Sequence, residues 1–170
     1  MIIIGEKING AIPSIKQAIA ERNEALIIER TLAQAAAGAN FLDCAPSTAT
    51  EIEYETMVWL IGLMQGATNV PLCIDSPNAK LLARVIEEGH LNKPGMVNSV
   101  NEEGDKCETI FPLIAGTPWE VVGLTCDQEG IPADPAKKAD IAKRIIDKAV
   151  KYGTSLNQLH IYPCVMALAT

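Results

Sequence analysis

Short apolar runs alternate with longer amphipathic stretches along the chain, a pattern that is typical of βαβ units. Several of these runs, such as residues 2–4 and 121–124, are apolar at successive positions, as expected for parallel strands that are buried on both faces. The predicted strands are Ile2–Ile8, Asn40–Ala45, Pro71–Asp75, Met96–Val100, Trp119–Thr125 and Gln158–Tyr162.

Amphipathic stretches predict a helix after each of the first five strands, with two helices after the first one. Asp134 and Pro135 suit the N-cap and the first position of a helix that Gly153 closes. Thr50 and Glu53 have the spacing of a capping box at the start of another helix. The predicted helices are Ser14–Glu21, Asn23–Ala37, Glu51–Met64, Asn78–Glu88, Glu103–Ala115 and Pro135–Tyr152.

The regular succession of strand and helix predicts a parallel α/β protein in which residues 1–170 form a single domain. Periodicity alone does not distinguish an open doubly wound sheet from a barrel. No G-x-G-x-x-G or G-x-x-x-x-G-K-[ST] motif follows a predicted strand. This absence removes the usual reason to choose a nucleotide-binding open sheet.

The composition is that of a soluble globular domain, with 48% apolar and 21% charged residues. Twenty-one acidic and 14 basic residues give a net charge of −7, which leaves no basic surface for a nucleic acid backbone. The apolar runs are shorter than the roughly 20 residues that span a bilayer, and the N-terminus does not resemble a signal peptide. We therefore expect no nucleic acid partner, no membrane partner and a cytoplasmic location.

The five cysteines form no Cys-x-x-Cys pair, which argues against a disulfide framework and against a zinc finger. Several lie near strand ends, where a soft-metal or cobalt site is one interpretation. Because free cysteine is among the most buried residue types, we favour core packing over metal binding. His90 and His160 have no local partner at metal or triad spacing, and we expect structural roles for both.

Polar side chains stand where the predicted strands end, and parallel β/α proteins bind their ligands at that edge. They are Glu6 and Asn9 after the first strand, Asp43 on the second, Asp75 on the third, Asn98 on the fourth and Asp127 after the fifth. Such a ring of carboxylates and amides suits a small polar heterocycle or a metal ion. Local roles are the alternatives. Asp75 suits a helix cap, Asn98 a backbone partner, and Glu6 an ion pair.

These motifs together resemble those of the pterin-binding methyltransferases. That family includes the methyltetrahydrofolate:corrinoid/iron–sulfur-protein methyltransferases and the folate domain of cobalamin-dependent methionine synthase. The likeness runs in order along the whole chain. It is carried by Gly5-Glu6-Lys7-Ile8-Asn9, Leu42-Asp43, Cys73-Ile74-Asp75-Ser76, Asn98-Ser99 and Gly123-Leu124-Thr125.

The resemblance implies a TIM-type (β/α)8 barrel that transfers a methyl group between tetrahydrofolate and the cobalt of a corrinoid. The corrinoid (cobalamin) is carried by a partner protein, and a homodimer is expected. By the same resemblance, Asp75 and Asn98 hydrogen-bond the edge of the pterin, and Asn98 is the candidate catalytic residue. Glu6, Asn9 and Asp43 are further candidates for substrate binding.

Two features depart from the family pattern. The family has Asp-Pro at the end of strand six, whereas this chain has Tyr162-Pro163, and a phenol lacks the charge and the two acceptor oxygens of a carboxylate. Tyr162 is therefore the candidate substrate-binding residue at that place. In addition, six predicted strands in 170 residues fall short of the roughly 250 residues of an eight-stranded barrel. We expect a fragment of a longer protein, or a fold that another chain completes.

Two other functions remain open from the sequence. One is a non-catalytic or degenerate barrel that binds a partner protein, which the tyrosine at position 162 and the missing strand seven would fit. The other is a dihydropteroate synthase-like reaction. It is disfavoured because no basic residues for phosphate binding are visible near the later strands.

Overall fold

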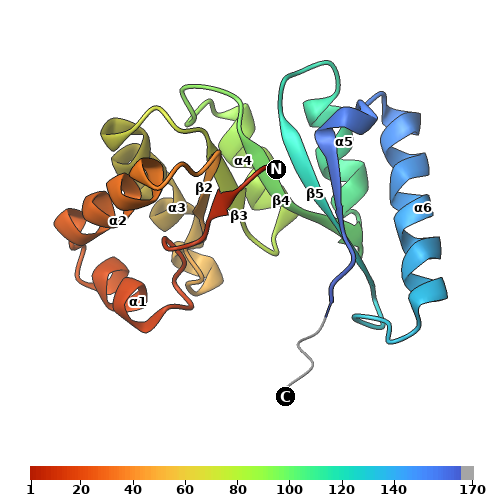
Figure 1. Ribbon diagram of the computed structural model, residues 1–170, viewed down its shortest axis with the longest axis horizontal. Helices are drawn as coiled ribbons and strands as arrows, with labels where there is room; N and C mark the ends of the chain where they lie inside the picture. Colours follow the sequence, from red (N-terminus) through yellow and green to blue (C-terminus); the bar gives the residue numbers. More distant parts are fainter. Residues whose placement is uncertain (166–170) are drawn as a thin grey trace. The chain divides into compact units, whose positions relative to one another are not determined.

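The computed structural model describes residues 1–165, along which strands and helices alternate (Figure 1). Every predicted strand and helix is present, with ends that differ from the predicted ones by a few residues at most. The chain divides into two compact units, Met1–Val97 and Asn98–Thr170. Among the described residues, no helix is both long enough and apolar enough to cross a membrane.

The first unit is built on three short parallel strands that pair in chain order. They are β1 (Ile4–Gly5), β2 (Phe41–Cys44) and β3 (Leu72–Asp75). Ile4 lies opposite Phe41, and Asp43 lies opposite Cys73. Because parallel strands end at the same edge, this register brings the polar ends of β1, β2 and β3 together.

Four helices cover these strands: α1 (Pro13–Ala20), α2 (Glu24–Ala36), α3 (Thr50–Ala67) and α4 (Ala79–Glu87). α2 and α3 pack side by side (Figure 1). Asn23 and Asn78 cap α2 and α4 through their side-chain oxygens, which accept hydrogen bonds from Leu26 N and Leu81 N. Side chains from strands and helices form the buried core of the unit, among them Ile15, Ile27, Leu42, Met57, Leu60, Met64, Ile74 and Leu82.

Two local predictions in this unit are wrong. The N-cap of α3 is Ala49, without a side-chain cap, so Thr50 and Glu53 form no capping box. Glu53 turns instead into the protein, where its side chain bonds to Ser76. Ile2 and Ile3 are half exposed rather than buried on both faces, because they precede the paired part of β1.

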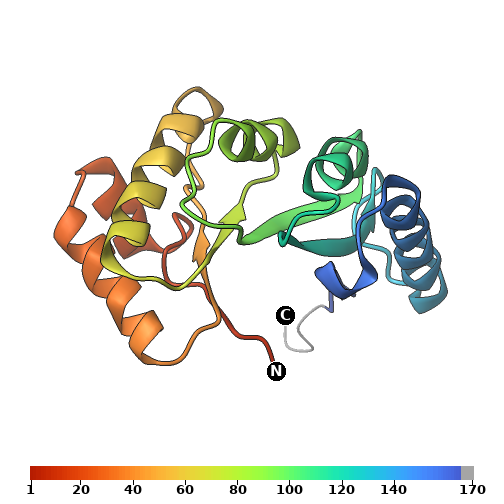
Figure 2. The same ribbon diagram turned by 90° about the horizontal axis from the view of Figure 1, so that it is seen from above.

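The second unit contains β4 (Met96–Glu102, which starts at the boundary), α5 (Lys106–Ile114), β5 (Glu120–Asp127), α6 (Pro135–Tyr152), a short 3-10 turn (Leu156–Gln158) and β6 (Leu159–Tyr162). β5 and β6 are parallel, with Val121 opposite Leu159. α6 lies along β5 (Figure 2). At Gly123 this approach is close enough that a Cβ would lie 3.2 Å from Ile145.

Burial along β5 alternates, which corrects the prediction that Val121–Leu124 is buried on both faces. Val121 is fully buried, whereas Val122 and Leu124 are only half buried. The reason is that one face of the strand packs on α6, while the other face is covered only in part.

The ends of α6 match their predictions. Asp134 accepts a hydrogen bond of 2.9 Å from Ala136 N, Pro135 is the first helical residue, and Gly153 closes the helix at φ 81°. Replacing Asp134 with alanine is expected to lower the free energy of unfolding by about 1 kcal/mol, because a helix N–H loses its acceptor. Urea denaturation measures this change. The exposed mid-helix variant Asp140→Ala is the control, and an equal loss in both variants would contradict the cap.

Candidate functional site

A group of carboxylates gathers at the ends of the strands of the first unit. Asp43 lies near the end of β2, Asp75 is the last residue of β3, and Glu6 directly follows β1. Asp43 is 1% exposed and Asp75 is partly buried, whereas Glu6 is exposed. These groups repel one another: Glu6 raises the pKa of both aspartates, and Asp75 also raises that of Asp43.

Burial is the largest cause of the shift at both aspartates. It acts together with the neighbouring charges of Asp75 and Glu6 to raise the pKa of Asp43 to about 8. The pKa of Asp75 rises to about 6, through burial, then Glu6, then Glu53. Near neutral pH, Asp43 therefore keeps its proton while Asp75 is mostly ionised. Neighbouring carboxyls in these two states can donate one hydrogen bond and accept another.

The Asp43 side chain is only partly satisfied. Hydrogen bonds with Cys73 and Asn9 lower its pKa and partly offset the effect of burial. Its Oδ1 atom is buried without a hydrogen-bond partner among the described residues. A buried polar atom without a partner costs free energy. A hydrogen-bonding group that reached this atom would remove that cost.

The loop that carries Asn9 is fixed by backbone and side-chain contacts. Asn9 Oδ1 accepts from Ala11 N at 2.9 Å and from Ser47 Oγ at 3.3 Å. The next residue must be glycine, because a Cβ on Gly10 would lie 2.0 Å from the carbonyl oxygen of Pro46. The loops after β1 and β2 thus hold each other, and Asn9 stays beside Asp43.

A buried pair behind this group was missed in the sequence. Ser76 Oγ donates a 2.6 Å hydrogen bond to Glu53 Oε1, and the two residues are 3% and 6% exposed. The available signal was helical spacing, because Glu53 lies one turn before Met57 and two turns before Leu60 on the buried face of α3. A carboxylate at such a position needs a partner inside the protein.

The remaining candidates lie in the second unit. Asn98 is the third residue of β4 and is half buried. Tyr162 is the last residue of β6, with 50% of its surface exposed. Thr125 on β5 has a buried hydroxyl that lacks a partner among the described residues. The predicted site residues therefore fall into two sets, with Glu6, Asn9, Asp43 and Asp75 in the first unit and Asn98 and Tyr162 in the second.

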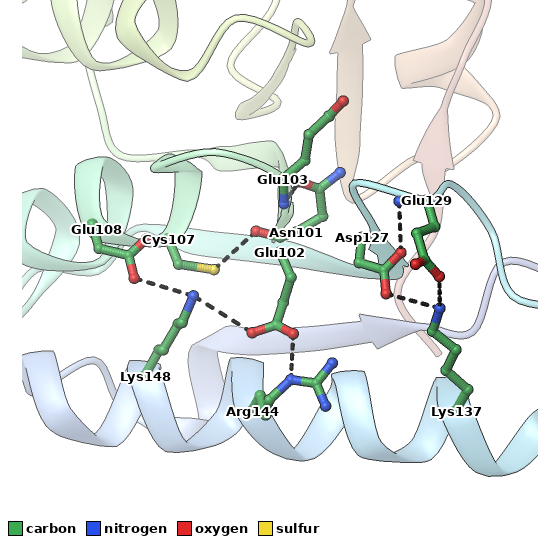
Figure 3. Close-up of polar contacts among 10 residues, drawn as sticks. All are labelled: Asn101, Glu102, Glu103, Cys107, Glu108, Asp127, Glu129, Lys137, Arg144 and Lys148. Carbon is green, nitrogen blue, oxygen red and sulfur yellow. Dashed lines mark hydrogen bonds and ion pairs between the residues drawn. The ribbon is translucent and has the colours of Figure 1, made fainter.

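The strand ends of the second unit also carry carboxylates, but cations of α6 neutralise them (Figure 3). Glu102, at the end of β4, pairs with Arg144 and, at 3.5 Å, with Lys148. Asp127, at the end of β5, pairs with Lys137 at 3.3 Å. A hydrogen bond from the backbone of Glu129, followed by the Lys137 contact, lowers the pKa of Asp127. Glu102, Asp127, Glu129, Lys137 and Arg144 line a shallow recess of about 340 Å³.

The cysteines and histidines have structural surroundings. Cys44, Cys73, Cys107 and Cys164 are buried, and burial raises the pKa of the Cys107 thiol to about 12. Within residues 1–165, no three side chains of His, Cys, Asp or Glu come together as metal ligands. His160 contacts Glu120 at 2.5 Å, and His90 contacts the Tyr54 hydroxyl at 2.8 Å.

The amino-acid sequence of the chain is similar to those of known proteins. It is 48% identical over 172 residues to the methylcorrinoid:tetrahydrofolate methyltransferase of Eubacterium limosum, a match that covers all of this chain and 63% of that protein. It is 27% identical over 177 residues to the methionine synthase of Mycobacterium tuberculosis, of which it covers 15%. No family model matches the sequence. The chain spans less than two thirds of the length of each of these relatives. The similarity to the methyltransferase along the whole chain confirms the predicted resemblance.

Solved structures with the same fold include dihydropteroate synthases. The enzyme from Xanthomonas albilineans in complex with 7,8-dihydropteroate aligns with a TM-score of 0.60 at 18% identity, over 94% of this chain and 57% of that one. The enzyme from Coxiella burnetii in complex with pteroic acid aligns with a TM-score of 0.64 at 13% identity, over 96% and 60% of the two chains. At these identities the likeness concerns the fold alone, and it confirms the predicted TIM-type β/α class.

The raised pKa of Asp43 makes the stability of the protein depend on pH. Its folded value of about 8 lies above the ordinary 3.8, so the contribution of this group is fully present below about pH 4 and is lost as the pH rises through 8. Relative to Asp43→Asn, the free energy of unfolding of the unmodified protein should fall by on the order of 5 kcal/mol between pH 4 and 8. Denaturation curves at several pH values measure this difference. The exposed variant Asp140→Asn is the control, and parallel pH profiles for Asp43→Asn and the unmodified protein would contradict the shift.

Proposed function

Because the chain is related over its whole length to a methylcorrinoid:tetrahydrofolate methyltransferase, we propose that the protein transfers a methyl group between tetrahydrofolate and a corrinoid. The folate is the substrate, and the corrinoid is carried by a separate partner protein. The observation that supports this proposal most is the 48% identity along the full chain. The carboxylate group at the ends of β1–β3 agrees with it, since its chemistry suits the polar edge of a pterin.

The pterin edge presents ring N–H and amino groups, which need acceptors. Asp75 is mostly ionised above pH 6 and can accept from them in a charge-assisted hydrogen bond. Asp43 keeps a proton up to about pH 8 and can donate to a ring nitrogen or oxygen. In this proposal Asn9 and Glu6 support the same edge, and Asn98 and Tyr162 keep the hydrogen-bonding roles that the family resemblance gives them.

The corrinoid supplies a cobalt centre that exchanges the methyl group with the folate. The methyl group leaves or joins a tertiary amine nitrogen, which is a poor leaving group unless it is protonated or hydrogen-bonded. In this proposal Asn98 hydrogen-bonds the edge of the pterin and so holds the ring in place while the bond between that nitrogen and the methyl group breaks or forms. The fixed strand ends hold the pterin in one orientation for an in-line displacement.

Removing the charge of Asp75 tests the proposed pterin contact. Asp75→Asn should weaken the binding of methyltetrahydrofolate at pH 7.5 by about 10-fold or more, because an amide replaces a charged acceptor in a partly buried place. Isothermal titration calorimetry measures the affinity. Asp127→Asn is the matched control, since that aspartate also ends a strand but lies in the second unit, where it pairs with Lys137. Equal affinity in Asp75→Asn and the unmodified protein would count against the proposal.

Position 162 allows the opposite test. Tyr162→Asp restores the carboxylate that the family has there, and a charge-assisted pair of this kind contributes about 2 to 5 kcal/mol. We therefore expect folate affinity to rise at least about 10-fold, again by calorimetry. Tyr162→Phe should give no such gain. If both variants bind folate as the unmodified protein does, position 162 does not contact the pterin.

A further inference from the structure

Glu53 is a buried carboxylate on a helix whose neighbouring buried positions are apolar. It is 6% exposed and shares the inner face of α3 with Met57 and Leu60. Its side-chain partner among the described residues is the hydroxyl of Ser76 rather than a cation. Burial of a carboxylate is costly, so a core side chain of this kind needs an explanation beyond packing.

The contacts of Glu53 lead to the end of β3. The backbone N–H of Asn78 donates to Ser76 Oγ at 3.0 Å, and Ser76 Oγ donates to Glu53 Oε1 at 2.6 Å. Asn78 also caps α4 by accepting from Leu81 N at 3.2 Å. The turn between Asp75 and α4 is therefore tied to α3 through one carboxylate. Because Ser76 directly follows Asp75, this tie also fixes where the Asp75 backbone lies.

Glu53 also acts on Asp75 through its charge. Burial, Glu6 and Glu53, in that order, raise the pKa of Asp75 to about 6. Of these two charged neighbours, Glu53 is buried and Glu6 is exposed, so water screens the charge of Glu53 less. Asp75 in turn raises the pKa values of other titratable groups in this unit, among them Asp43 and the thiols of Cys44 and Cys73.

We propose that Glu53 is a positioning residue for Asp75, which fixes the strand-end turn through Ser76 and places a second negative charge near the Asp75 carboxylate. This inference rests on the proposed function, in which Asp75 accepts from the pterin. Together with burial and Glu6, Glu53 thereby raises the pH below which Asp75 stops being an acceptor for the ligand.

A purely structural role for Glu53 predicts something different. Glu53→Gln keeps the shape of the side chain and the oxygen that accepts from Ser76, so a structural role leaves Asp75 unchanged in this variant. A positioning role that acts through charge predicts that Asp75 loses its proton at a lower pH in this variant. The control is Glu55→Gln, which removes the same charge from an exposed position of the same helix.

The first experiment is a ¹³C NMR titration of the Asp75 side-chain carboxyl in the unliganded chain, with the signal assigned from Asp75→Asn. In Glu53→Gln the midpoint should fall by about 0.5 to 1 pH unit, whereas Glu55→Gln should match the unmodified protein. An unchanged midpoint in Glu53→Gln would overturn the proposal.

The second experiment measures methyltetrahydrofolate affinity by calorimetry from pH 5 to 8. In Glu53→Gln, the low-pH loss of affinity should move down by the same interval as the NMR midpoint. Ser76→Ala keeps the charge of Glu53 but removes the hydrogen bond that joins the turn to Glu53. It should therefore lower folate affinity at pH 8 and leave the titration midpoint of Asp75 near its original value. Normal affinity in Ser76→Ala would overturn the positioning role. Absence of binding by the unmodified protein would overturn the proposed function instead, while the NMR midpoints still decide the effect of Glu53 on Asp75.

Discussion

The burial of neighbouring carboxyl groups at one edge of the strands is the constraint on which the candidate site of the first unit depends. Parallel pairing of β1, β2 and β3 brings their ends to one edge, and the surrounding apolar core keeps water from Asp43. This cost is reduced because Asp43 stays protonated near neutral pH. The pKa of Asp75 is also raised, to about 6. A ligand with several N–H groups reduces the same cost, because its donors stabilise the negative charge of an ionised carboxylate.

In the second unit, carboxylates at the strand ends are stabilised in a different way. Glu102 and Asp127 also end strands, but α6 supplies Arg144, Lys148 and Lys137 as counter-ions. Carboxylates that are already paired gain little from a new donor and lose part of their pairing if a ligand displaces it. Because Glu102 and Asp127 are paired with cations, whereas Asp43 and Asp75 have raised pKa values, we favour the strand ends of unit one over the recess of unit two for recognising a nitrogen-rich ring.

The fold and part of the site were predictable from local patterns. Strand and helix identities follow from periodicity, and the ends of α6 follow from Asp134, Pro135 and Gly153 because each acts within one turn. The predicted capping box at Thr50 is wrong, because the position of Glu53 also fits a residue that faces the core. In the structure the Glu53 side chain faces the core and bonds to Ser76. The partner of Glu53 is 23 residues away. Likewise, the raised pKa of Asp43 depends in part on Asp75 and Glu6, which lie at the ends of two other strands. No local sequence pattern indicates this.

In the proposed function, the pterin of a folate lies against the carboxylates at the ends of β1–β3. A crystal structure of the protein with bound methyltetrahydrofolate tests it most directly. We expect the amino and ring N–H groups of the pterin within hydrogen-bond distance of the Asp75 carboxylate, with Asp43 Oδ1 facing a ligand atom or an ordered water that bridges to it. A pterin bound elsewhere, for example in the recess beside Glu102 and Arg144, with Asp43 and Asp75 untouched by the ligand, would contradict it.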